Sequence, residues 1–226
     1  MSLMKFLAAA CALLATLPCR ADDGKDLDLS ISTELMTRQT SYGNSSRLQP
    51  SVDMQYRTRF GALYIQDGEG GWALPAPAGW VSLGVASEPI WSLGGGVSQS
   101  MGVARYGFDL PKDGSLSFGY ADRIGDQHPG HLLVASLDAP LFDWRGQKFS
   151  LLGWASLANQ TRRLSLGHSD DGAGWQLEQS NLLLVMSHPL GQRWTLDVGA
   201  GSRWAAENTG SHTAGWQTLL GFTWKL

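Results

Sequence analysis

Hydrophobic and polar residues alternate with a period of two along several segments of the chain. In residues 27–35 the apolar positions are Leu27, Leu29, Ile31 and Leu35, and polar or charged residues stand between them. Successive side chains of a β-strand point to opposite faces, so this segment predicts a strand with one apolar and one polar face. The same alternation recurs in residues 48–57, 194–204 and 216–226.

This alternation fits a soluble β-sandwich as well as a membrane barrel, because both bury one face of each strand. Trp194 and Trp204 stand ten residues apart on one face. That spacing is ~33 Å along a strand, or ~25 Å across the membrane at a tilt of ~40°, the height of the apolar band of an outer-membrane barrel. Trp216 and Trp224 bracket the last strand similarly. We therefore predict an antiparallel transmembrane β-barrel in which these four tryptophans form the membrane girdle.

The carboxy-terminal segment has the pattern of a sorting signal for outer-membrane barrels. Phe222, Trp224 and Leu226 share one face of the last predicted strand, which runs to the end of the sequence. We expect these three residues to form the signal that the outer-membrane assembly machinery reads. Leu226 departs from the aromatic residue that more often ends such a signal.

Eight further segments have strand patterns. They are residues 59–66, 79–86, 101–110, 115–122, 131–138, 147–157, 161–167 and 175–187, and a weaker pattern covers 90–97. Bacterial single-chain barrels have even strand numbers, so we predict twelve strands, with ten as the alternative. With the carboxy-terminus in the periplasm, 205–212 and 168–174 become outer loops and 188–192 a periplasmic turn. Further upstream the lengths conflict, because the long segment 123–130 falls on the periplasmic side and the short turn 111–114 outside.

The first 21 residues have the features of a cleaved signal peptide. Lys5 is followed by an apolar stretch over residues 6–17, and Pro18 precedes a small-x-small cleavage site that ends at Ala21. The expected mature domain, residues 22–226, lies in the outer membrane of a Gram-negative cell, in contact with its lipid. Both cysteines, Cys11 and Cys19, lie in the leader, so disulfides and thiolate sites are excluded from the mature chain.

The charge of the chain argues against nucleic acid as a partner. Removal of Lys5 and Arg20 with the leader changes the formal net charge from −3 to −5, and the chain has no basic block. The charged residues of the polar faces are expected to line the barrel interior: Asp28, Glu34, Asp53, Arg57, Asp197, Arg203 and Lys225. Val198 is expected to face lipid. An arginine there should cost ~2–4 kcal/mol, and an arginine at Gly199 or Gly201 less if the interior has room.

Residues with catalytic or metal-binding potential do not form a convincing site. His168, Ser169, Asp170 and Asp171 combine a base, a hydroxyl and carboxylates, but they are consecutive in a glycine-rich loop and point in different directions. His128 and His131 flank a Pro-Gly turn without a third ligand at fixed spacing. We therefore predict no catalytic residue, no metal site and no cofactor.

The second half of the chain resembles the MipA/OmpV family of outer-membrane proteins. The residues that carry the resemblance are those of 108–114 (FDLPKDG), 126–131 (DQHPGH), 154–156 (WAS), 166–169 (LGHS), 187–194 (SHPLGQRW) and 220–224 (LGFTW). The family's Trp-Ala-Asp and Tyr-Phe-Gly-Val segments are altered here. Membership would imply a non-enzymatic barrel, and one relative is a scaffold between a murein hydrolase and a murein synthase.

Three functions are compatible with these features. The first is a structural or scaffold barrel of the cell envelope, with a murein hydrolase and a murein synthase as the partners that the resemblance implies. The second is a narrow channel for small solutes, which the charged interior favours, although side chains can fill a barrel of this size. The third is a lipid-modifying enzyme of the outer membrane.

Overall fold

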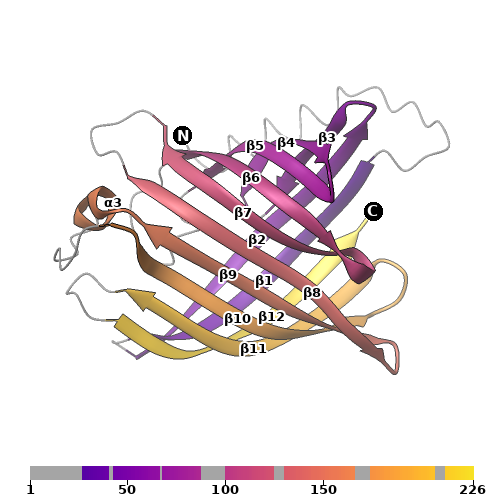
Figure 1. The fold of residues 1–226 in the computed structure, drawn as a ribbon. Helices are drawn as coiled ribbons and strands as arrows, with labels where there is room; N and C mark the ends of the chain where they lie inside the picture. The colour runs from indigo at the N-terminus through magenta and orange to yellow at the C-terminus, as the bar shows by residue number, and fades with distance from the viewer. Residues whose placement is uncertain are drawn as a thin grey trace.

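The described part of the chain is a closed antiparallel barrel (Figure 1). The computed structural model describes residues 27–40, 43–66, 68–87, 100–124, 130–165, 174–206 and 212–226. These contain twelve strands: β1 (Leu27–Thr40), β2 (Gly43–Thr58), β3 (Gly61–Gln66), β4 (Glu69–Ala76), β5 (Gly79–Ser87), β6 (Ser100–Leu110), β7 (Gly114–Arg123), β8 (His131–Trp144), β9 (Gln147–Ala158), β10 (Gln176–Pro189), β11 (Trp194–Ala206) and β12 (His212–Lys225). Each strand pairs with its sequence neighbours, and β1 closes the barrel by pairing with β12. The predicted all-β barrel of twelve strands is confirmed.

Alternation along the strands separates an outward from an inward set of side chains. In β11, Val198 is 41% exposed, whereas its neighbour Gly199 is buried. Large apolar residues are also exposed on the outward face of strands around the barrel, such as Ile31, Leu83 and Phe118. Polar and small residues dominate the opposite face of β1 and β11. The period-two pattern therefore predicts both the strands and the face of each.

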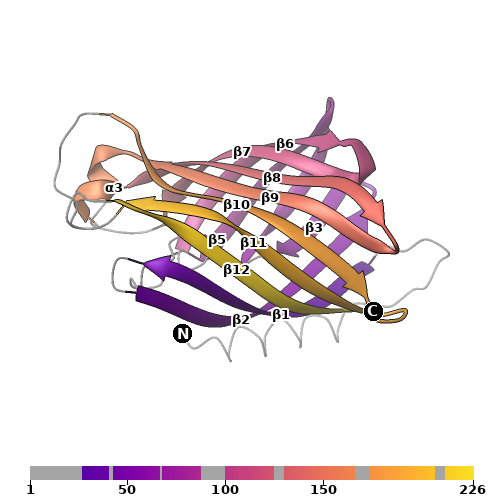
Figure 2. The same cartoon turned by 90° about the horizontal axis from the view of Figure 1, so that it is seen from below.

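The two ends of the barrel differ in their connections (Figures 1 and 2). Residues 59–60, 77–78, 111–113, 145–146 and 190–193 make short connections at one end, called the turn end, where the carboxy-terminus also lies. The opposite end, called the loop end, holds the segments that join β5 to β6, β7 to β8, β9 to β10 and β11 to β12. One of these contains the short helix α3 (Gln160–Ser165).

Strand β4 was not predicted from the sequence. Its segment, Glu69–Ala76, contains Gly70, Gly71 and Pro75, which are typical of loops. In the structure these residues pair with β3 and β5, and Trp72 and Leu74 keep the outward parity. Gly71 is required by packing, because a Cβ atom there would overlap the backbone of Leu83 and Gly84 and approach the Tyr64 hydroxyl. A glycine selected for close approach was thus mistaken for a turn residue.

The strand predicted at 161–167 is wrong, since residues 161–165 belong to helix α3. The Asn159 side chain caps this helix, its Oδ1 accepting a hydrogen bond from the backbone N–H of Arg162 at 2.9 Å. This error and the missed β4 offset each other in the strand count. Placing both correctly also removes the conflict in loop lengths, because the 111–113 turn now lies at the turn end and the connection before His131 at the loop end. The leader (1–21) and the weak pattern at 90–97 lie outside the described residues.

Candidate functional site in the barrel interior

The interior contains an apolar cluster towards the loop end. It consists of Ala86, Met101, Val103, Ala121, Leu132, Val134 and Ala158, with Trp154 packed against it. These residues come from β5, β6, β7, β8 and β9, and each of the seven is at most 5% exposed. The cluster therefore fills one side of the interior with side chains that bind neither ions nor polar solutes.

A second apolar cluster lies on the opposite run of strands. Leu183, Val185 and Leu219 are buried together, with Met36 and Leu152 against them. Leu219 departs from the polar character of its face in the sequence, and this cluster explains it. Gly199 lies opposite both Val185 and Leu219 in register. A Cβ atom on Gly199 would come within 3.0 Å of the Val185 side chain, and one on Gly201 would overlap the Leu182 backbone. The expectation of room at these two glycines is therefore wrong.

Between the apolar residues, a polar network links β3, β4, β6, β7 and β8. Glu69 accepts hydrogen bonds from Arg105 Nη2 at 2.8 Å and Nε at 3.0 Å, and from the Tyr64 hydroxyl at 2.6 Å. The Arg105 side chain also reaches Ser117, whose hydroxyl lies 2.7 Å from that of Ser136. Charge-assisted bonds in such a setting are strong, and each charge here is paired. The sequence did not single out this network.

The predicted interior residues lie on the inward parity but do not converge. Asp197 accepts hydrogen bonds from the hydroxyls of Ser187 at 2.5 Å and Thr223 at 3.2 Å. Arg57 donates to the Gln55 side chain at 3.4 Å, near the turn end. The others are Asp28, Glu34, Asp53, Arg203 and Lys225, and they are distributed along β1, β2, β11 and β12. They line the interior rather than form one catalytic group.

At the loop end, a buried ion pair anchors helix α3. The Arg162 side chain is 0% exposed and donates to both Glu178 oxygens, from Nε at 3.0 Å and from Nη2 at 3.0 Å. Glu178 is the extra residue of a β-bulge, because the pairing register between β9 and β10 shifts between Leu177 and Gln179. Gly130 lies against Arg162, where a Cβ would come within 2.9 Å of the arginine Cα.

His131 is the one predicted metal or catalytic candidate within the described residues. Tyr120 Oη lies 2.6 Å and Asp122 Oδ1 3.1 Å from the same ring nitrogen, Nδ1. A catalytic relay requires partners on opposite ring nitrogens, which this arrangement does not provide. No group of three or more potential metal ligands occurs in the described ranges. His128 and the group of His168, Ser169, Asp170 and Asp171 lie outside them.

The predicted girdle tryptophans lie on the outward parity of β11 and β12. Trp194 pairs with Trp224 near the turn end, and Trp204 and Trp216 lie towards the loop end. Trp194 is 51% and Trp216 43% exposed. Phe222 and Leu226 share this outward parity, and the Leu226 N–H donates to the Leu29 carbonyl at 3.1 Å, joining the terminus to β1. Their roles as girdle and assembly signal stay predictions.

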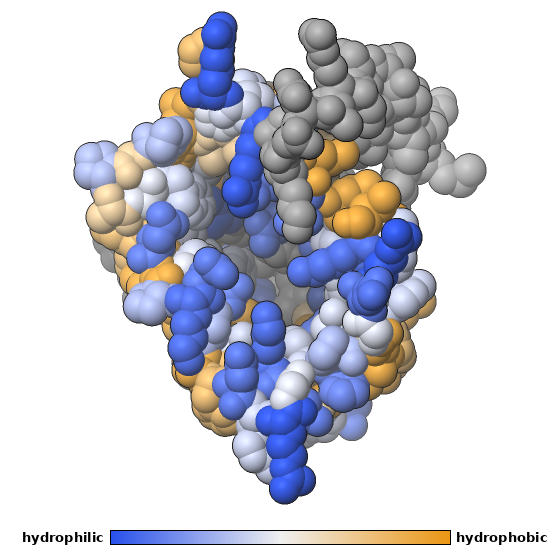
Figure 3. Space-filling model, turned by 90° about the vertical axis from the view of Figure 1, so that its right-hand side faces the viewer, coloured by the Kyte–Doolittle hydropathy of each residue, from blue (hydrophilic) through white to orange (hydrophobic). Residues whose placement is uncertain are grey.

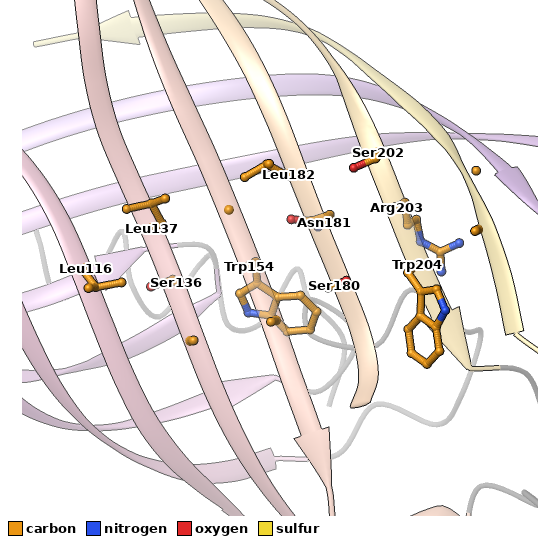
Figure 4. A pocket seen from close by; sticks show the side chains of 15 residues that line it. Leu116, Ser136, Leu137, Trp154, Ser180, Asn181, Leu182, Ser202, Arg203 and Trp204 are labelled. Atoms are coloured by element: carbon orange, nitrogen blue, oxygen red, sulfur yellow. The ribbon is translucent and has the colours of Figure 1, made fainter. Parts of the chain in front are cut away.

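A shallow apolar hollow of about 480 Å³ crosses the wall from β7 to β12 (Figure 4). It forms where small residues adjoin in register: Ala135 beside Ala155, and Ala155 beside Ser180. Outward leucines such as Leu137 and Leu182, with Trp204, form its rim. The hollow offers van der Waals contact to an apolar group and no reactive chemistry.

Within the described part of the chain, no helix has both the length and the apolar character needed to cross a bilayer.

Comparison with known proteins assigns no family. No protein-family model matches the sequence, and no curated protein matches it. Among solved structures, the chain is similar to Neisserial surface protein A, with 13% identity over 89% of this chain and 97% of that one, at a TM-score of 0.26. A TM-score this low supports no conclusion about function, so the barrel's own geometry must supply the evidence. The resemblance to the MipA/OmpV family stays a prediction.

Proposed function

We propose that this chain is a Gram-negative outer-membrane barrel, with its loop end outside the cell and its turn end in the periplasm. The observation that carries the proposal is the exposed apolar surface of a closed barrel. Side chains such as Leu63, Leu83, Leu184 and Leu220 are more than 40% exposed on the outward face. In water such a surface would be strongly unfavourable, whereas a bilayer covers it.

Fractionation and gel migration test this placement. The full chain should appear in the outer-membrane fraction and shift in migration on heating, because a folded barrel resists unfolding by detergent without heat. Phe222→Ala combined with Trp224→Ala should lower the assembled fraction if the terminal pattern is the assembly signal. Thr218→Ala, an exposed position on the same strand, is the matched control. A soluble periplasmic pool without a heat shift would refute the placement.

We infer further that the barrel acts as a structural or scaffold protein of the envelope rather than an enzyme. The two apolar clusters narrow the interior, and its best-connected charged groups, Glu69 and Arg105, are engaged with each other. In this proposal partners bind the rims, and the turn at 190–193 is the first candidate surface on the periplasmic side. A murein hydrolase and a murein synthase are the partners that the family resemblance implies.

Complementation of a deletion strain under envelope stress distinguishes scaffold from enzyme. One variant replaces His168, Ser169 and Asp170 by alanine, and a second replaces the turn at 190–193. If the scaffold proposal is right, the loop variant retains function and the turn variant loses it while both barrels assemble. Loss of function in the assembled loop variant alone would favour an enzyme, and a lipid mass spectrum of the deletion strain would then show whether lipid is the substrate.

A narrow channel is the second candidate function. Hydrophilic side chains surround a hollow at the turn end of the barrel (Figure 3), and the inward faces of β1 and β2 carry Asp28, Glu34, Asp53 and Arg57. Conductance in planar bilayers separates the candidates. Discrete conductance steps from the purified barrel favour a channel, and a silent bilayer that contains folded protein favours the scaffold.

A further inference from the structure

Three arginines gather on the inward faces of β1, β2 and β11, towards the loop end. Arg38 lies on β1, Arg47 on β2 and Arg203 on β11. Arg47 stands opposite Met36 in register, one inward position from Arg38. The positive charges of Arg47 and Arg203 both act on Arg38, and part of the Arg38 side chain is withdrawn from water. Like charges on adjacent strands repel, so this grouping requires a compensating interaction.

A buried amide lies within the arginine group. Gln217 of β12 is the register partner of Arg38 on one side and of Gly201 on the other, and Arg203 is two residues from Gly201. The Gln217 side chain is 0% exposed, yet neither its Nε2 nor its Oε1 has a hydrogen-bond partner. Buried polar atoms are almost always hydrogen-bonded in proteins, so this amide indicates a ligand.

The inward acidic groups of these strands lie elsewhere. Asp28, Glu34, Asp53 and Asp197 are all nearer the turn end, and Glu34 is four residues, or ~13 Å, from Arg38 along β1. Asp197 is engaged with Ser187 and Thr223, and Glu178 of β10 is engaged with Arg162. Among the described residues of these strands, acidic and basic side chains are therefore segregated along the interior.

We propose that Arg38, Arg203 and Gln217, with Arg47 at the entrance, form a binding site for a phosphate-type oxyanion. Guanidinium groups match the geometry of phosphate oxygens with paired N–H donors, and the Gln217 Nε2 supplies a neutral donor at the base of the site. The ligand is a free phosphate or the phosphate of a lipid headgroup. The site is a property of the folded interior and does not depend on either proposed function.

The test uses the full barrel folded in a non-ionic detergent whose headgroup contains no phosphate. The melting temperature is followed against inorganic phosphate at constant ionic strength, with chloride as the balancing anion. Wild-type protein should show a saturable rise, because a ligand that binds the folded state stabilises it. Arg38→Gln and Arg203→Gln should each weaken the apparent affinity at least tenfold. Arg57→Gln is the control, since Arg57 also faces inward but lies near the turn end.

Gln217→Glu gives the sharpest result, because it places a carboxylate where the anion would bind. This variant should melt higher than wild type without phosphate and lose the response to phosphate. A parallel titration uses mixed micelles that contain a lipid with a phosphate monoester headgroup. A response to this lipid alone, abolished by the same substitutions, assigns the site to a lipid headgroup. No saturable response to either probe, or equal responses in wild type and Gln217→Glu, would overturn the proposal.

Discussion

Arg162 and Glu178 form a two-point ion pair at the loop end, with both hydrogen bonds 3.0 Å long and the arginine side chain fully buried. The pair joins α3 to the bulge of β10, two elements that share no backbone ladder. Breaking such a pair from one side leaves a buried charge without its counterpart, whereas replacing both partners by apolar residues removes the problem.

We therefore expect Glu178→Gln to destabilise the loop end by about 3–5 kcal/mol. Hydrogen exchange of the α3 backbone should accelerate, while exchange in β11 stays unchanged. The double variant Arg162→Met with Glu178→Leu should recover most of the protection. Asp113→Asn, in the exposed turn between β6 and β7, is the control for loss of a carboxylate. Equal protection of α3 in wild type and Glu178→Gln would mean that the ion pair does not anchor the helix.

Val198 tests the direction in which the wall faces. Val198→Arg should lower the free energy of unfolding in lipid by about 2–4 kcal/mol, because the side chain points outward into the apolar band. Gly199 and Gly201 are unsuitable controls, since any side chain there meets neighbouring atoms. Gln49→Arg is the matched inward control, because Gln49 stands opposite Glu34 in register. Equal penalties at Val198 and Gln49 would contradict the inward and outward assignment.

The girdle assignment is testable by the depth of tryptophan fluorescence. Brominated acyl chains quench side chains that contact lipid, so Trp194→Phe and Trp216→Phe should each lower the quenchable fraction of the emission. Trp154→Phe should not, because Trp154 packs against the interior apolar cluster. The measurement requires only folded protein in vesicles. A drop with Trp154→Phe as large as with Trp194→Phe would contradict the assignment.

The sequence predicts features that depend on one strand and its surroundings, and fails where distant strands meet. Val198 and Asp197 could be assigned to opposite faces because alternation is a local property of the chain. Leu219 could not be explained locally, since its partners Leu183 and Val185 lie on another strand. The pairing of Glu69 with Arg105, 36 residues away, likewise follows from barrel closure rather than from a motif. Gln217 resembles any other interior polar residue until its burial is known.

Strand β4, which the sequence pattern missed, contains two adjacent glycines with different surroundings. Gly70 and Gly71 lie on opposite faces of this strand. A Cβ on Gly71 would overlap the Leu83 carbonyl oxygen and lie 2.7 Å from the Gly84 Cα, whereas a Cβ on Gly70 would meet its nearest atom at 3.7 Å. Backbone atoms cannot move aside as a flexible side chain can, so only Gly71 is required by the structure.

Gly71→Ala should therefore cost at least about 3 kcal/mol, the upper end of overpacking penalties, and lower the heat-modifiable fraction of the barrel. Gly70→Ala should change stability by less than about 0.5 kcal/mol, since its methyl group would point outward with ordinary contacts. Urea titration of both variants in the same vesicles measures the difference. If residues 69–76 were a loop, as the glycines and Pro75 suggest in the sequence, the two alanines would be tolerated equally. A large difference between them requires a paired strand whose one face is packed against β5.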